Sequence, residues 1–205
     1  MVSEIRIYIE GGGDQRATKA ALREGMGKFL YSLRERARQC GIRWNIVACG
    51  GRNSTFDAFK TAMRQHVHAF NVLLVDAEAP VSKEPWAYLH ERDQWFMDGL
   101  HDEQCHLMVQ CMEAWIIADI DALAHFYGQG FRRKDIPGSP NVEEIDKTRL
   151  ADCLKTATRA TRKGEYHKTR HAPQIVGLLN KDTVCQKASY CRRLFDTLIR
   201  KMENG

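Results

Sequence analysis

Four short segments of the chain have the hydrophobic patterning of β-strands. Residues 5–10 alternate strictly between apolar and polar side chains, and residues 42–48 form a second candidate strand. Residues 70–75 form an almost uninterrupted apolar run, which is typical of a strand buried on both faces. Residues 106–111 are the fourth candidate. Period-two alternation and short apolar runs bounded by turn residues both favour strands over helices.

Helical spacing of apolar side chains dominates the segments between these strands. Residues 18–40 carry one apolar stripe and predict a single long helix that ends before Gly41. Asn53 or Ser54 is expected to cap a second helix that runs to about residue 68. Further helices are expected over residues 85–98 and 113–127, and as shorter pieces within residues 142–202.

Strand and helix alternate through the first two-thirds of the chain, and the last third adds helices only. Such alternation predicts an α/β fold, in which a parallel sheet is flanked by helices on both faces. We therefore expect an α/β core over residues 1–130 and a helical C-terminal extension over residues 131–205 that packs on the core.

Composition agrees with a globular protein that buries a sizeable core. Of the 205 residues, 43% are hydrophobic and 28% are charged, which argues against a disordered chain. No run of about 18 apolar residues occurs, and the first residues lack the pattern of a signal peptide, so neither a membrane span nor secretion is expected. The seven cysteines include no CxxC pair and are expected to be reduced thiols in the cytoplasm.

Charge is distributed unevenly along the chain, although the formal net charge is only +5. Residues 76–121 contain eleven acidic and two basic side chains, whereas residues 147–205 contain fourteen basic and five acidic ones. This asymmetry favours one surface for cations and another for a polyanion. The basic side chains that we expect to contact nucleic acid are Arg52, Arg162, Lys163 and Arg170. A surface salt bridge for Arg52, and a protein-docking role for the basic C-terminal third, remain open alternatives.

Acidic residues lie where three of the four predicted strands end. Glu10 ends the first strand, Asp76 and Glu78 follow the third, and Glu113 follows the fourth. The carboxyl ends of parallel strands meet at one edge of the sheet, where ligands bind in open α/β folds. Converging carboxylates repel one another unless a cation lies between them, and oxygen-rich sites suit Mg²⁺ or Mn²⁺. The sequence therefore predicts a divalent-metal site at this edge.

These acids, taken in order, resemble the motifs of the Toprim domain as it occurs in the overcoming lysogenisation defect (OLD) nucleases. The segment from Glu10 to Asp14, with three glycines between the acids, resembles the first motif, and Asp76-Ala77-Glu78 resembles the acid-x-acid motif. Cys111-Met112-Glu113 lies where that class has Ser-x-Glu, and Lys168 lies near the position of its lysine. Most of residues 1–180 is similar to a family of small standalone bacterial Toprim-like proteins.

The resemblance implies a Toprim-like, Rossmannoid fold and two-metal cleavage of phosphodiester bonds. Glu10, Asp76 and Glu78 would hold the ions, and Asp14 and Glu113 would complete the second site or position water. Lys168 would stabilise charge that develops on the phosphate. The resemblance further implies an ABC-type ATPase partner supplied in trans and a role in anti-phage defence.

Two other interpretations remain open at this point. The chain is alternatively a catalytically silent Toprim-fold subunit that binds or regulates an ATPase complex. A receiver-like phosphoacceptor domain also gathers acids at strand ends, but it needs a pair of acids after the first strand, where this chain has Glu10 alone. Homo-oligomerisation is possible under each interpretation.

Overall fold

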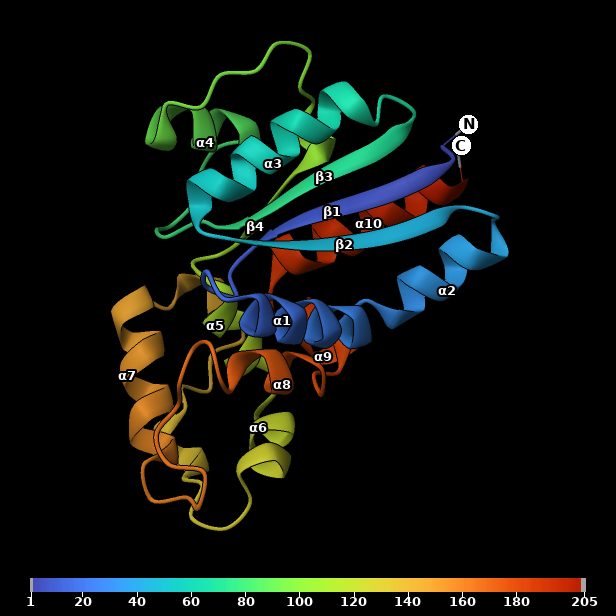
Figure 1. Ribbon diagram of the computed structural model, residues 1–205. Helices are drawn as coiled ribbons and strands as arrows, with labels where there is room; N and C mark the ends of the chain where they lie inside the picture. The colour runs from blue at the N-terminus through green and yellow to red at the C-terminus, as the bar shows by residue number, and fades with distance from the viewer. Residues whose placement is uncertain (1, 204–205) are drawn as a thin grey trace.

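A four-stranded parallel sheet with helices on both faces forms the centre of the protein in the computed structural model, which describes residues 2–203 (Figure 1). The strand order is β2-β1-β3-β4, and all three neighbouring pairs are parallel. The strands are β1 (Glu4–Glu10), β2 (Arg43–Gly50), β3 (Ala69–Asp76) and β4 (Cys105–Met108). The predicted α/β fold is confirmed, and so is the helical character of the C-terminal third.

The connections contain ten α-helices and three short 3-10 helices among the described residues. The α-helices are α1 (Arg16–Phe29), α2 (Tyr31–Gln39), α3 (Arg52–Gln65), α4 (Pro85–Asp93), α5 (Met112–Ala118), α6 (Ile120–Tyr127), α7 (Lys147–Thr158), α8 (Ala172–Val176), α9 (Lys181–Lys187) and α10 (Ser189–Glu203). The 3-10 helices are Asp102–Gln104, Arg133–Asp135 and Val142–Glu144.

Two helices that the sequence predicts as continuous are each broken once. The helix expected over residues 18–40 breaks at Leu30, which is fully buried and has a non-helical ψ of 16°. The helix expected over residues 113–127 breaks at Asp119. One Asp119 oxygen caps α6 by accepting from the Ala122 N–H, and the other accepts from the Asn180 N–H at 2.8 Å. The tertiary contact with Asn180 explains why the local pattern does not reveal the second break.

Two helix boundaries also differ from the sequence-based prediction. Gly51, and neither Asn53 nor Ser54, is the N-cap residue of α3, and its carbonyl accepts from both the N–H and the hydroxyl of Thr55. Helix α4 ends at Asp93, five residues earlier than expected, because Gln94 adopts a left-handed conformation with φ of 55°. This early end leaves Asp93 at the end of α4, where it meets Arg52.

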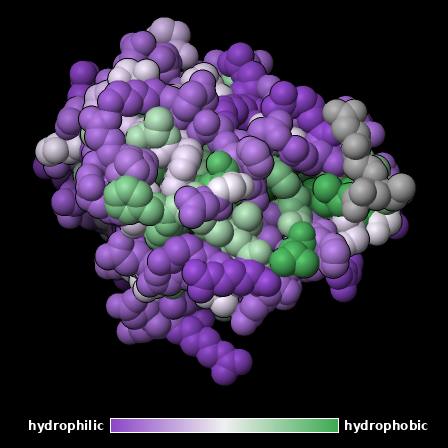
Figure 2. Space-filling view, turned by 90° about the horizontal axis from the view of Figure 1, so that it is seen from above, coloured by the Kyte–Doolittle hydropathy of each residue, from purple (hydrophilic) through white to green (hydrophobic). Residues whose placement is uncertain are grey.

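Each face of the sheet is covered by its own hydrophobic cluster. Ile5, Ile7 and Ile9 of β1 belong to the larger cluster, which lies between the sheet and helices α1, α2 and α10. Tyr8 and the fully buried Leu73 point into the smaller cluster, under α3 and α4. Seen from the α3 and α4 side, hydrophobic residues form a band between hydrophilic surroundings (Figure 2). Burial of apolar surface on both faces is the main force that holds these layers together.

The C-terminal helices share the larger cluster with the sheet and with α1. The Phe195 ring of α10 lies edge-on to Phe29, with the centroids 5.7 Å apart. Arg193 of α10 donates to the carbonyl oxygen of Cys105 at 2.8 Å and thereby occupies an acceptor of the edge strand β4. No helix within residues 2–203 combines the length and the apolar character that crossing a membrane requires.

Candidate metal centre

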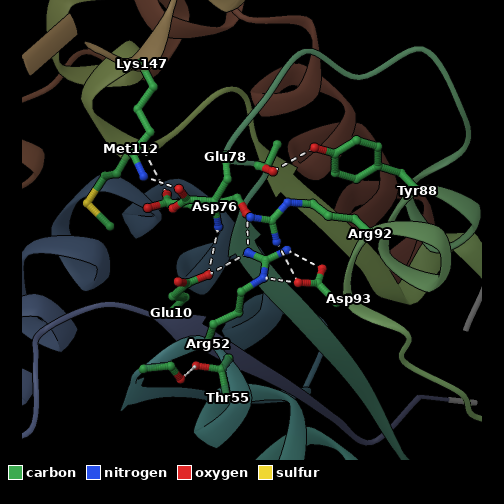
Figure 3. Close-up of polar contacts among 12 residues, drawn as sticks. Glu10, Arg52, Thr55, Asp76, Glu78, Tyr88, Arg92, Asp93, Met112 and Lys147 are labelled. Carbon is green, nitrogen blue, oxygen red and sulfur yellow. Dashed lines mark hydrogen bonds and ion pairs between the residues drawn. The ribbon is translucent and has the colours of Figure 1, made fainter.

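Three carboxylates meet at the carboxyl edge of the sheet (Figure 3). Glu10 ends β1 and Asp76 ends the neighbouring strand β3, while Glu78 follows two residues later. One ligand oxygen from each carboxylate lies within 4.8 Å of the other two. The adjacency of β1 and β3 therefore brings together acids that are far apart in the sequence.

The backbone after β3 turns Glu78 back toward Asp76. Side chains two positions apart on a regular strand point to the same face but stand about 6–7 Å apart along it, so regular extension would keep the two carboxylates farther apart than they are. Ala77 still bonds to β4 through the Met108 carbonyl, but Glu78 has a φ of 71°. The Glu78 N–H donates to the carbonyl oxygen of Gln110 at 2.6 Å. This left-handed residue, which is uncommon for a glutamate, places the third carboxylate in the cluster.

Glu113 lies beside the cluster and is linked to it through Lys168. The Lys168 Nζ is 3.1 Å from Asp76 Oδ2 and 3.6 Å from Glu113 Oε2. Tyr166 donates its hydroxyl hydrogen to the other oxygen of Glu113 at 3.0 Å. Asp76 itself accepts from the Met112 N–H through Oδ1 at 2.9 Å. Two residues of the loop between α7 and α8 thus contact these acids: Lys168 contacts Asp76 at the end of β3 and Glu113 in α5, and Tyr166 contacts Glu113.

Arg52, at the start of α3, is held inside the site by four hydrogen bonds and one contact with an aromatic ring. It donates to both carboxylate oxygens of Asp93, at 2.7 and 2.6 Å, and to Glu10 Oε2 at 3.1 Å (Figure 3). It also donates to the carbonyl oxygen of Asp76 and lies 5.1 Å above the Trp95 ring. Of the two sequence-based alternatives for Arg52, the structure favours the ion pair, because the guanidinium is engaged within the chain and not displayed to a phosphate.

Lys147, the first residue of α7, contacts the third acid of the cluster. Its ammonium group forms an ion pair with Glu78 Oε2 (Figure 3). Its backbone N–H donates to the Gln110 side-chain oxygen at 3.3 Å. Each of the three clustered carboxylates therefore has one cationic side chain beside it: Arg52 beside Glu10, Lys168 beside Asp76, and Lys147 beside Glu78.

The ionisation of these groups reflects burial and mutual repulsion. Burial, together with the negative charge of Asp76, raises the pKa of Glu10 to about 7. Burial also raises the pKa of Asp76 above its usual value, against the opposing charge of Lys168. The pKa of Glu78 is lowered, because the hydrogen bond and charge of Lys147 outweigh its burial. Burial opposes ionisation of Lys168, but Asp76 and Glu113 outweigh it and raise its pKa.

The donor set fits a hard divalent cation. All three clustered ligands are carboxylates, which Mg²⁺ and Mn²⁺ prefer. Burial and the neighbouring charge of Asp76 raise the pKa of Glu10 in spite of Arg52, so a negative charge there is unfavourable without a further cation. Glu113 Oε2 is buried and accepts no hydrogen bond from residues 2–203. An added cation relieves both a costly buried negative charge and a buried oxygen that has no hydrogen-bond donor.

Two of the five predicted metal ligands lie outside the cluster. Asp14 is exposed on the loop after β1, where three consecutive glycines with positive φ separate it from Glu10. Glu113 is buried, but it reaches the cluster only through Lys168. Among the described residues, Glu10, Asp76 and Glu78 form the one group of at least three side chains with metal-ligand proximity.

The predicted nucleic-acid contacts other than Arg52 are exposed on the loop between α7 and α8, which also carries Lys168. Arg162, Lys163 and Arg170 all face solvent. The Lys163 ammonium lies 4.8 Å from the centroid of the Phe126 ring, and Arg170 donates to His171 at 3.1 Å. Three basic side chains therefore lie in the same loop as the lysine that contacts Asp76.

Lys147, Asp93 and Tyr166 were not identified from the sequence. Tyr166 stands two residues before Lys168, and this proximity was an available signal. Lys147 and Asp93 had no comparable signal, because each reaches the site through a tertiary contact with a residue more than 40 positions away. Lys147 begins α7 and Asp93 ends α4 at the edge of the site, and the local sequence pattern does not predict either boundary.

Comparison with known proteins identifies a family but no characterised relative. Neither the curated proteins nor the solved structures include a significant match. One family model, described as a domain of unknown function, matches residues 9–199, which include the end of β1, the other three strands, the acidic cluster and most of the C-terminal helices. The chain therefore belongs to this family, DUF4276.

Proposed function

We propose that this protein is a divalent-metal-dependent nuclease that cleaves phosphodiester bonds in DNA or RNA, with Mg²⁺ or Mn²⁺ as cofactor. The observation that carries the proposal is the convergence of Glu10, Asp76 and Glu78 within 4.8 Å at the carboxyl edge of the sheet. Lys168 lies beside this cluster and forms an ion pair with Asp76. Carboxylates with an adjacent fixed cation are the group types that phosphodiester hydrolysis requires.

The chain's own residues supply distinct parts of this chemistry. A divalent ion held by the three carboxylates would polarise a phosphate oxygen and lower the pKa of water. Lys168 stays protonated because its pKa is raised, so it acts as a positive charge beside the reacting phosphate and not as a base. Tyr166 donates to one oxygen of Glu113, and the other oxygen of Glu113 lies 3.6 Å from the Lys168 ammonium. In a two-ion mechanism, Glu113 is the candidate for the additional carboxylate ligand.

The exposed basic loop supplies a surface for the polymer. Arg162, Lys163 and Arg170 face solvent in the loop that carries Lys168, so a backbone bound there would lead toward the carboxylates. Lysine and arginine contacts to phosphates provide affinity that does not depend on base sequence. This arrangement suits a nuclease that recognises the backbone first.

The cellular context of the proposal rests on the resemblance to the OLD nucleases. It comprises a cytoplasmic location, an ABC-type ATPase partner supplied in trans, and a role as the effector of an anti-phage defence system. Activity of the isolated chain is therefore to be tested both alone and with an ATPase encoded beside it.

Cleavage of a mixed substrate panel tests the nuclease proposal directly. Plasmid DNA, single-stranded DNA and total RNA are incubated with Mn²⁺ or Mg²⁺, and wild type is compared with Asp76→Ala. Cleavage that needs metal and disappears in the variant supports the proposal and identifies the polymer. Cleavage that persists in Asp76→Ala contradicts the assignment of the site.

The second candidate function is a catalytically silent Toprim-fold subunit of an ATPase complex. The observation that favours it is the ion pairing of every clustered carboxylate with a cation of the same chain, namely Arg52, Lys147 or Lys168. A purely structural network of this kind needs no metal. Titration with Mn²⁺ separates the two functions. The nuclease would bind Mn²⁺ and lose that binding in Glu10→Gln, whereas the silent subunit would show no Glu10-dependent binding.

A further inference from the structure

The three cations around the acidic cluster differ in how firmly they are held. Arg52 has a side chain that is only 15% exposed, and its guanidinium contacts three acceptor residues as well as an aromatic ring. It cannot leave Glu10 without losing the bidentate pair with Asp93, and such pairs are geometrically demanding. Arg52 is therefore a fixed part of the site.

Lys168 is held by two acids at once. Its side chain is 48% exposed, but its ammonium lies 3.1 Å from Asp76 Oδ2 and 3.6 Å from Glu113 Oε2, and these two acids are only 5% and 7% exposed by side chain. Both carboxylates would be left buried without a counter-charge if Lys168 moved away, and buried charges without partners are strongly unfavourable. Lys168 therefore also stays with the acids.

Lys147 has a single acidic partner among the described residues. Its side chain is 41% exposed, and its only ion pair is with Glu78, which is itself 23% exposed. The base of the side chain is fixed, because its N–H donates to the Gln110 side chain and Asp146 caps the helix. The ammonium at the end of a four-carbon stem is free to rotate into solvent at little cost.

The main chain of Glu78 is fixed independently of Lys147. Gln110, which is 2% exposed, accepts from the Glu78 N–H through its carbonyl oxygen. The same residue accepts from the Lys147 N–H through its side-chain oxygen. Gln110 thus holds the two partners in register, so the carboxylate keeps its place beside Asp76 when the ammonium leaves.

We propose that Lys147 is a displaceable counter-ion, which neutralises Glu78 in the metal-free protein and leaves it when a divalent cation binds to Glu10, Asp76 and Glu78. The inference rests on the metal site of the proposed function and adds a means by which that site stays stable without its ion. Because Lys147 and the cation compete for the same carboxylate, the lysine lowers metal affinity. Removing its charge is therefore expected to tighten metal binding.

Mn²⁺ titration of the full chain tests this competition without reference to cleavage. Binding is followed by calorimetry or by the electron paramagnetic resonance signal of free Mn²⁺. Lys147→Met and Lys147→Gln are each expected to lower the Mn²⁺ dissociation constant about three- to tenfold, as expected for loss of one nearby unit charge at a partly exposed site. Lys155→Met is the matched control, because it removes the same charge from an exposed position of the same helix.

The outcomes separate this inference from the proposed function. If wild type binds Mn²⁺ and Glu10→Gln abolishes that binding, the metal site stands. An unchanged or weakened affinity in both Lys147 variants would then overturn the displacement alone. If neither wild type nor the Lys147 variants bind Mn²⁺ in a Glu10-dependent way, the metal site and the displacement both fail. Thermal unfolding without metal confirms that each variant is folded before the comparison.

Discussion

Lys168 and Asp76 lie 3.1 Å apart by their Nζ and Oδ2 atoms, although 92 positions separate them in the sequence. The contact joins the C-terminal helical region to the end of a central strand. Asp76 is 3% exposed, so its carboxylate depends on Lys168 and on the Met112 N–H for compensation. The basic third of the chain is thus part of the acidic site and not merely an appendage to the sheet.

Replacement of Lys168 by methionine is expected to separate catalysis from metal binding. The variant keeps the hydrophobic stem but lacks the charge that stabilises the reacting phosphate, so cleavage is expected to fall by about 100- to 1,000-fold. Mn²⁺ binding is expected to be retained and not weakened, because the three clustered carboxylates are intact and a positive charge beside Asp76 has been removed. The measurement is the initial cleavage rate at saturating Mn²⁺, beside a calorimetric titration of the same preparation.

Lys155→Met is again a suitable control for the Lys168 variant. Lys155 is exposed on α7, so its replacement changes net charge by the same amount away from the cluster. Equal loss of cleavage in both variants would mean that overall charge, and not contact with Asp76, determines the rate. An undiminished rate in Lys168→Met would remove Lys168 from the catalytic group.

Glu10→Gln is expected to stabilise the metal-free protein while it abolishes metal binding. The pKa of Glu10 is raised from 4.5 to about 7, so the folded state retains a proton that the unfolded state releases. Stability is therefore lost as pH rises from 4.5 through 7, by about 3 kcal/mol at pH 8 for a shift of this size. Glutamine mimics the neutral carboxyl at every pH and avoids this loss.

Urea denaturation at pH 8 and at pH 4.5, in the presence of a chelator, measures the Glu10 effect. We expect the variant to exceed wild type by about 2–3 kcal/mol at pH 8 and by almost nothing at pH 4.5. Added Mg²⁺ is expected to stabilise wild type alone. A variant that is less stable than wild type at pH 8 would show that the carboxylate is fully compensated within the chain.

The sheet and the strand-end acids were predictable because each depends on a short local pattern and one topological rule. Glu10 and Asp76 end strands that their own hydrophobic residues define, and parallel strands bring such ends together. Glu78 required one more step, namely that the chain leaves the extended conformation after Ala77. Asp14 was predicted as a ligand from resemblance alone, and three positive-φ glycines leave it exposed and outside the cluster.

The counter-ions and the helix breaks depend on tertiary contacts that no local pattern encodes. Lys147 begins a helix that Gln110 positions, and nothing near Lys147 in the sequence refers to Glu78. The break at Leu30 has neither glycine nor proline beside it and coincides with complete burial of that side chain. The break at Asp119 is fixed by Asn180, a residue 61 positions away.

His106 is expected to make the protein less stable as pH falls below 6.5. Burial, and the positive charge of Arg193, lower the pKa of His106 from 6.5 to about 3. The imidazole Nδ1 faces the Arg193 guanidinium at 3.2 Å, and Nε2 donates to the Glu103 carbonyl at 3.0 Å. The neutral ring satisfies both partners, whereas protonation would set two cations against each other.

The sign and size of the His106 effect follow from proton linkage. Between pH 6.5 and 3 the unfolded state binds a proton that the folded state does not, so stability rises with pH in this window. Lowering the pH from 6.5 to 5 is expected to cost about 2 kcal/mol through this residue. The measurement is the free energy of unfolding at both pH values in wild type and in His106→Gln. Equal pH dependence in the two proteins would contradict the prediction.

Arg52→Lys is expected to destabilise the protein although it preserves the charge. A lysine ammonium cannot bind both oxygens of Asp93 while it also reaches Glu10, and it loses the planar contact with Trp95. We expect a loss of about 2 kcal/mol in the free energy of unfolding, measured in urea. Arg92→Lys, a change to a more exposed partner of the same Asp93, is expected to cost less than about 0.5 kcal/mol.

Replacement of Arg162, Lys163 and Arg170 by alanine is expected to weaken nucleic-acid binding in a salt-dependent way. Each phosphate contact contributes about 0.7–0.9 to the slope of log affinity against log salt, so loss of three contacts lowers the magnitude of that slope by about 2–3. Fluorescence anisotropy with a labelled oligonucleotide and a chelator measures binding without cleavage. The control removes Arg34, Arg36 and Arg38 from α2, which is exposed and lies at the far side of the molecule from the loop between α7 and α8 (Figure 1). If both triple variants lower the slope equally, nucleic-acid binding depends on the net charge of the protein. If only the loop variant lowers it, the nucleic-acid backbone binds along the loop that carries Lys168.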